Sequence, residues 1–127
     1  MSRLAFFLSG TLLFMAAGFC LAEELRQIDF RDAVQPILRR HCYRCHGLKN
    51  KEAGLQLNRR GSVLSVGDSD EPIVVPGDVN ASLLIHRIQN DAYGDIMPPD
   101  SDPLSSREIE TLKNWIAQGA VWPDELS

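Results

Sequence analysis

HCYRCHG, residues 41–47, is the stretch on which the interpretation of the whole chain depends. Two cysteines stand two residues apart, and a histidine follows the second one directly. Three chemistries use a C-x-x-C pair: a zinc site, a redox dithiol and covalent attachment of a haem. The residues around the pair have to distinguish among them.

The zinc and dithiol alternatives leave the histidine unexplained. A zinc site needs four ligands, commonly two cysteines and a distant second pair. No second C-x-x-C is present, and His41 and His46 flank the cysteines instead of forming a separate pair. A thioredoxin-like dithiol needs no histidine after its second cysteine and lies in a βαβ fold, of which this sequence carries no signal.

C-x-x-C-H is the signature of c-type haem attachment. Cys42 and Cys45 would each add to one vinyl group of the same porphyrin, and His46 would lie beneath the iron as its proximal ligand. With two cysteines and three histidines in the last 105 residues, chance produces roughly 0.001 such motifs. We therefore expect one covalently bound haem c.

Met97 is the candidate for the sixth position of the iron. It is the only methionine after residue 22, and Pro98 and Pro99 follow it, so it should lie on a stiff, extended loop. The alternative for Met97 is an ordinary place in the core. His86 is a rival ligand, but its expected position on the polar side of a helix indicates a surface residue. His41 adjoins the attachment site on the wrong side to reach the iron, and we also expect it at the surface.

The N-terminus has the pattern of a secretory signal peptide. Arg3 precedes an apolar run from Leu4 to Phe19, and small residues lead up to Ala22. We expect a signal peptide at residues 1–22 and one cytochrome c-like haem domain at residues 23–127. The alternative is an uncleaved membrane anchor, because the stretch from Leu4 to Ala22 approaches the length of about 20 apolar residues that is needed to span a membrane. Export also suits c-type haem attachment, which is completed outside the cytoplasm, so we expect a periplasmic or exported protein.

Charge is divided unevenly along the chain. Residues 23–60 hold nine Lys or Arg and five Asp or Glu, whereas residues 61–127 hold three and twelve. The net acidity argues against a nucleic-acid partner. We expect redox partner proteins, with acidic partners docking near Arg39, Arg40, Arg44 and Lys49, and membrane contact only if the leader is uncleaved. The alternative for the basic residues is an ordinary solvated surface.

Three helices and a loop-rich middle are expected. Asp29 should begin a helix that leads to Cys42 and is kinked or broken at Pro36. Residues 47–77 should form loops with one or two short strands and a helical turn near 62–65, and a second helix should begin at Asn80. The last helix is the best marked: Ser105 and Glu108 form a capping box, Leu104 and Ile109 a hydrophobic staple, and Gly119 the stop.

The chain resembles the planctomycete-type cytochrome c domain, a relative of class I cytochromes c. The resemblance rests on Cys42-Tyr43-Arg44-Cys45-His46-Gly47 and Met97-Pro98-Pro99, and on packing and turn segments that include Val75-Pro76-Gly77, Arg87-Ile88 and Trp115-Ile116. Two positions depart from the family pattern: Asn58 stands where such domains tend to carry Asp, and Asp70-Glu71 interrupts a turn that is usually rich in glycine.

The resemblance implies a mainly α domain wrapped around one haem, with Cys42 and Cys45 as anchors and His46 and Met97 as axial ligands. Its function would be to carry single electrons between redox partners, with no catalysis by the domain alone. One alternative is a haem sensor or peroxidase-like enzyme with a labile sixth ligand. A cysteine-based redox or zinc protein is the other.

Overall fold

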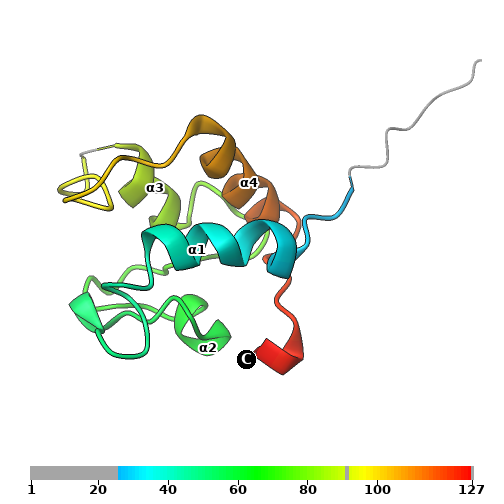
Figure 1. Cartoon of the computed structure of the whole chain (residues 1–127), viewed down its shortest axis with the longest axis horizontal. Coiled ribbons are helices and arrows are strands. Elements are labelled where there is room, and N and C mark those ends of the chain that lie inside the picture. The colour runs from blue at the N-terminus through cyan, green and yellow to red at the C-terminus, as the bar shows by residue number, and fades with distance from the viewer. Residues whose placement is uncertain (1–25, 91, 127) are drawn as a thin grey trace, which may run out of the picture.

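A computed structural model of the chain describes residues 26–90 and 92–126, which form a mainly α fold with long loops (Figure 1). These residues contain four α-helices: α1 (Gln35–His41), α2 (Arg60–Val63), α3 (Leu83–Gln89) and α4 (Ser106–Ala117). A π-helical turn (Phe30–Val34) precedes α1, and 3-10 turns occur at Glu52–Gly54 and Asp124–Leu126. The predicted fold class is confirmed. The predicted signal peptide and its boundary lie outside the described residues.

The segment from Asp29 to His41 forms one helical rod with a change of pitch. The side chain of Asp29 accepts a hydrogen bond from the Asp32 N–H at 2.9 Å, as the sequence predicts. The Gln35 N–H then donates to the Phe30 carbonyl five residues back, which is a π-helical bond. The kink or break expected at Pro36 is therefore a π-helical turn directly before it, because proline has no N–H to continue the regular α-helical hydrogen bonds.

The loop-rich middle contains no strand among the described residues. Its β pairing is limited to isolated bridges, His46 with Lys51, Val66 with Pro72 and Val75 with Asp78. The short strands expected between residues 47 and 77 are thus absent from this part of the structure. The expected helical turn near Ser62 is present as α2, and it begins two residues earlier, at Arg60.

Helix α3 begins at Leu83, later than the Asn80 start that the sequence indicates. Two side chains bond to the backbone before it. Asp78 accepts from the Ala81 N–H at 3.0 Å, and the Ser82 hydroxyl donates to the Asp78 carbonyl at 2.7 Å. Such local bonds compete with the helical ladder, so residues 80–82 form a turn instead.

Helix α4 has the ends that the sequence predicts. Ser105 and Glu108 form the capping box, and Gly119, with φ of 100°, ends the helix in the left-handed region. Leu112, Trp115 and Ile116 are buried along one side of it. Trp115 joins Trp122 and Phe30 in an aromatic cluster, in which the rings of Phe30 and Trp122 have centroids 3.9 Å apart.

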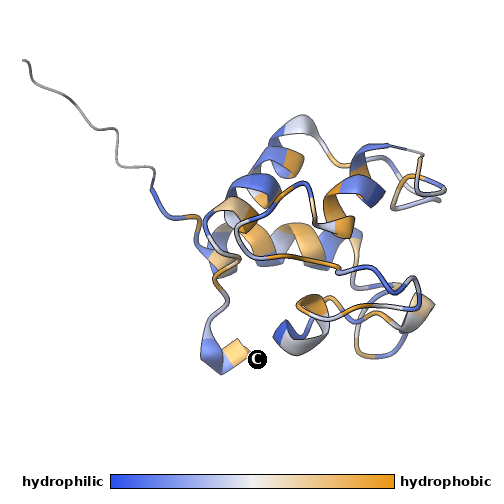
Figure 2. Ribbon diagram, turned by 180° about the vertical axis from the view of Figure 1, so that it is seen from behind, coloured by the Kyte–Doolittle hydropathy of each residue, from blue (hydrophilic) through white to orange (hydrophobic). Residues whose placement is uncertain are grey.

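The core lies where the apolar sides of α1, α3 and α4 face one another (Figure 2). The first and last described segments also meet. The Ile28 N–H donates to the Gln118 side chain at 2.7 Å, and Arg31 pairs with Glu125. Within the described ranges, no helix has the length and apolar character needed to cross a membrane.

Candidate cofactor site

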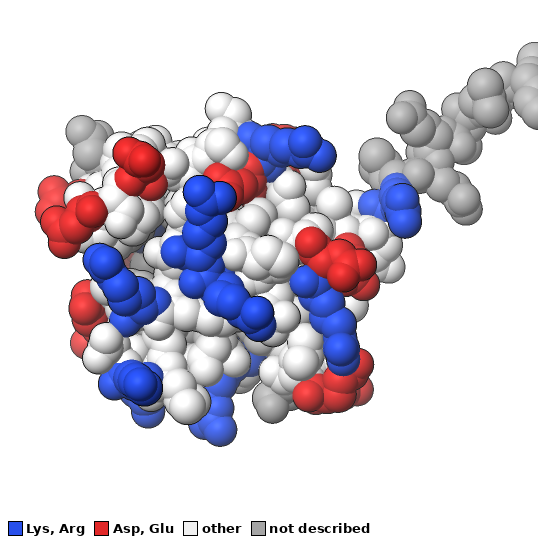
Figure 3. Space-filling view, in the orientation of Figure 1, with Lys and Arg blue, Asp and Glu red and all other residues white. Residues whose placement is uncertain are grey.

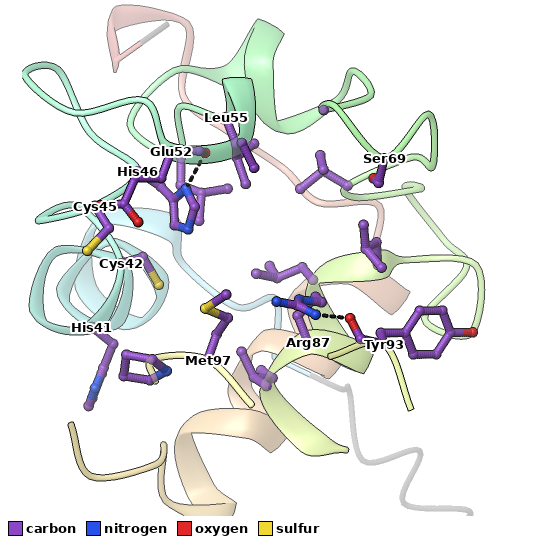
Figure 4. Close-up of a pocket in the computed structure, with 18 of the residues that line it drawn as sticks. His41, Cys42, Cys45, His46, Glu52, Leu55, Ser69, Arg87, Tyr93 and Met97 are labelled. Carbon is purple, nitrogen blue, oxygen red and sulfur yellow. Dashed lines mark hydrogen bonds between the residues drawn. The ribbon is translucent and has the colours of Figure 1, made fainter. Parts of the chain in front are cut away.

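A cavity of about 460 Å³ lies between the attachment turn after α1, the middle loops, α3 and the segment that leads to α4. Its volume is within the range of about 300–1,000 Å³ that ligand sites usually have. Cys42, Cys45, His46 and Met97 all line it, so the structure brings together the four residues singled out in the sequence (Figure 4). Its apolar walls include Leu55, Leu57, Ile73, Leu84, Ile88 and Leu104.

The attachment turn continues directly from α1. The Cys42 N–H donates to the Leu38 carbonyl at 2.9 Å, and the His46 N–H donates to the Cys42 carbonyl at 2.8 Å. The turn ends at Gly47, where only glycine fits, because a Cβ at this position would collide with the backbone carbonyl of Tyr43. Helix α1 thus delivers both cysteines and the histidine to one side of the cavity.

His46 is held in one orientation by the loop that follows it. The Glu52 N–H donates to the Cys45 carbonyl at 3.1 Å, and His46 Nδ1 lies 3.0 Å from the Glu52 carbonyl oxygen. A carbonyl can only accept, so Nδ1 carries a proton, and in the neutral ring Nε2 therefore has the lone pair. Figure 4 shows the ring pointing into the cavity, where Nε2 is available to a metal ion.

The two thiols differ in their surroundings, and neither is in a disulfide. Cys42 is buried, whereas Cys45 is partly exposed. Burial, with a smaller contribution from Cys45, raises the pKa of the Cys42 thiol to about 12. Dithiol oxidoreductases need a lowered thiol pKa to form the attacking thiolate. The raised pKa of Cys42 therefore argues against the redox-dithiol alternative.

Met97 reaches the cavity from the segment after α3. Its N–H donates to the Arg87 carbonyl at 2.7 Å, and Pro98 and Pro99 beside it also line the cavity. In Figure 4 its sulfur and the His46 ring point into the same space from different elements. A nitrogen and a thioether sulfur on two sides of one cavity form a donor set that suits a haem iron.

The rival ligand His86 lies elsewhere. It is not among the residues that line the cavity. Its Nε2 lies 2.7 Å from the Asn80 carbonyl oxygen, and its ring stacks on Tyr93 with centroids 4.7 Å apart. The structure thus places His86 where the sequence indicates, away from the candidate iron position.

The expectation that His41 is a surface residue is wrong. Its side chain is 11% exposed, it lines the cavity, and its Nε2 lies 3.0 Å from Oε1 of Glu108 on α4. The partner is remote in sequence, and the packing of α4 beside the end of α1 removes His41 from solvent. Figure 4 shows the His41 ring directed away from the middle of the cavity, so it is not placed as a ligand.

Arg87 is a site residue that reasoning from the sequence did not single out. Among the described residues that line the cavity, it is the only Lys or Arg. Its guanidinium donates to the Tyr93 carbonyl, and Gly94 lets the loop pass over it, since a Cβ there would meet the guanidinium nitrogen. The sequence did contain a pattern that could have identified Arg87 as a site residue. Leu84, Arg87 and Ile88 are at i, i+3 and i+4, and therefore share one side of α3.

The model of the family described as Planctomycete cytochrome C matches residues 42–101. This match supports a planctomycete-type cytochrome c domain in this part of the chain. The match begins at the first cysteine of the motif and includes Met97, which confirms the resemblance noted in the sequence. It implies a haem-binding, electron-carrier domain with covalent haem c. The match leaves His41 and all of α4 outside it. No curated protein and no solved structure matches the chain.

Proposed function

We propose that this protein is a periplasmic monohaem c-type cytochrome that carries single electrons between redox partners. Cys42 and Cys45 are the thioether anchors, His46 is the proximal ligand and Met97 is the distal ligand. One observation carries the proposal: these four side chains, spread over 56 positions of the sequence, line the same cavity.

The residues of the cavity fit a covalently bound haem c. When bound, the haem supplies an iron that accepts one electron and gives it back. The bond from His46 to the Glu52 carbonyl holds the imidazole in the tautomer that can ligate. Apolar walls keep water away, and Met97 as the sixth ligand raises the reduction potential relative to a second histidine. With His46 and Met97 as its two ligands, the iron would have no position open for a substrate, which favours an electron carrier over an enzyme.

Arg87 supplies the positive charge that a haem needs from its site. A haem carries two carboxylate groups, and burying them without a cation is costly. Arg87 lines the cavity from α3, whereas the cysteines line it from the attachment turn. We assign Arg87 to these carboxylates.

The proposal of export rests on the leader at residues 1–22. A charged start and an apolar run leading to small residues are typical of a signal peptide. Covalent attachment fits an exported domain, because a cofactor that is covalently linked cannot be lost by dilution.

The partner is proposed to be an acidic redox protein. Arg39, Arg40, Arg44 and Lys49, here called the basic face, are all exposed around the end of α1 and the attachment turn. Figure 3 shows Lys and Arg side chains across the middle and lower left of the molecule, whereas at its top and right Lys or Arg and Asp or Glu lie side by side. A surface on which basic side chains gather orients an approaching partner of opposite sign.

The test uses protein matured in a host that is competent in c-type haem attachment. Intact mass should exceed that of the mature polypeptide by one haem, and the oxidised protein should show the methionine–iron charge-transfer absorption. Met97→Ala should abolish this band, whereas Ile96→Ala, at an exposed neighbouring position, should keep it. A band that survives Met97→Ala refutes the ligand assignment, and a colourless protein supports the cysteine or zinc alternative. Rapid binding of carbon monoxide to the reduced protein would favour the sensor or peroxidase alternative.

A further inference from the structure

The carboxylate of Glu108 has a bonded partner on each of its two oxygens. Oε2 accepts from the Ser105 N–H and the Ser105 hydroxyl, both at 2.8 Å, which completes the capping box of α4. Oε1 lies 3.0 Å from Nε2 of His41, which is 67 residues away in the sequence. One side chain therefore links the start of α4 to the end of α1.

The two linked positions adjoin the two segments that carry the proposed ligands. His41 directly precedes Cys42 in the attachment turn. Ser105 ends the segment that begins at Met97, and Met97, Pro98, Pro99 and Leu104 of this segment line the cavity. At its start, the segment is held by the bond from the Met97 N–H to the Arg87 carbonyl. At its end, the capping box and Glu108 hold it to His41.

We propose that His41 and Glu108 are positioning residues that hold the Met97 segment against the haem-attachment turn, and so keep the methionine sulfur on the iron. The inference rests on the proposed function, since it concerns the distal ligand. It goes beyond the family match, because both residues lie outside residues 42–101.

The surroundings of the pair distinguish it from an ordinary surface ion pair. The side chains of His41 and Glu108 are 11% and 24% exposed, whereas those of Arg31 and Glu125 are 49% and 64% exposed. Partly buried pairs are screened less by salt and hold a fixed geometry better than exposed ones. The two Ser105 bonds, and then His41, lower the pKa of Glu108 to about 2, so its carboxylate is charged at neutral pH. The exposed pair provides a matched control on the same helical rod.

The consequence for the site concerns competition at the sixth position. A methionine on a firmly held segment leaves the iron rarely, so an added ligand competes poorly with it. If the link from His41 to Glu108 is cut, the segment keeps its start and its helix cap, but it loses its tie to the attachment turn. An external ligand should then displace Met97 more readily.

The experiment is an imidazole titration of the oxidised holoprotein, followed by loss of the methionine–iron charge-transfer band. His41→Leu cuts the link without touching the capping box, and should raise the imidazole association constant about tenfold, as expected for losing a hydrogen bond to a charged group. His41→Gln, which can still donate to Glu108, should stay near the wild type. Glu125→Gln, which removes the exposed pair, should leave the constant unchanged.

A second variant addresses the same link from α4. Glu108→Ala should also weaken retention of Met97, and adding His41→Leu to it should have little further effect, because the partner is already gone. Glu108→Ala on its own also tests the link if His41→Leu fails to mature. Imidazole binding within twofold of the wild type in both single variants would overturn the inference and leave the ligand assignment intact. A wild-type protein without the methionine–iron band would overturn both.

Discussion

Replacing Phe30 by alanine should remove a large part of the stability of the domain. Phe30 begins the helical rod that ends at the attachment turn, and its side chain is 2% exposed. Its ring lies 3.9 Å from that of Trp122 and 5.9 Å from that of Trp115, centroid to centroid. Removing a buried phenylalanine costs about 3–5 kcal/mol, against a total stability of about 5–15 kcal/mol for a typical domain. For a domain of about 100 residues, each kcal/mol lowers Tm by about 4–8 °C, so Tm should fall by about 12–40 °C.

The assay is thermal unfolding of the holoprotein, followed by far-ultraviolet circular dichroism. Below the transition, the visible spectrum of Phe30→Ala should match the wild type, because the anchors and ligands are untouched. Val121→Ala is the control, since Val121 is 49% exposed and its truncation should change the free energy of unfolding by no more than about 0.5 kcal/mol. A Phe30→Ala protein within about 1 kcal/mol of the wild type would show that the aromatic cluster does not hold the rod to α4.

Three further outcomes follow from the structure. The Ser105 and His41 bonds lower the pKa of Glu108 from 4.5 to about 2, so its carboxylate stabilises the fold above pH 4.5 and loses this effect as the pH falls toward 2. The difference in unfolding free energy between wild type and Glu108→Gln, measured in urea, should shrink over that range; a constant difference contradicts the reasoning. Gly47→Ala should lower Tm through the collision with Tyr43, whereas Gly61→Ala, which has open space around it, should not. If the two variants change Tm by the same amount, the turn at Gly47 does not require glycine. Electron transfer with an acidic partner should slow as salt is added, and charge reversal on the basic face should remove most of that salt dependence. If the rate of electron transfer does not change with salt concentration, the partner docks on another surface.

Features fixed by a few neighbouring residues could be predicted well from the sequence. The capping box of α4 depends only on Ser105 and on Glu108 three residues later. The end of α4 depends only on the glycine after it, Gly119, which adopts the left-handed conformation. The attachment motif is equally local. The placement of Met97 and His46 on one cavity could be predicted, because a six-coordinate haem iron takes two axial ligands and the chain offers a single methionine after residue 22.

Features that depend on competition or on distant partners could not be predicted in this way. The late start of α3 results from Asp78 and Ser82 bonding to nearby backbone, which hydrophobic periodicity does not register. The burial of His41 depends on Glu108, 67 positions away, and no local pattern reports such a contact. Both misses concern polar side chains, whose partners are chosen by the tertiary structure.

The first and last segments of the described chain contact each other, because Ile28 bonds to Gln118 and Arg31 to Glu125. In Figure 1 the first described residues lie at the right and the C-terminal end lies at the bottom, and none of the residues that line the cavity belongs to residues 26–30 or 118–126. A tether fused to the C-terminus should therefore anchor the domain to an electrode with its redox centre facing the electrolyte. The same geometry suits the domain to linkage in series with other modules, since neither junction would obstruct the passage of electrons.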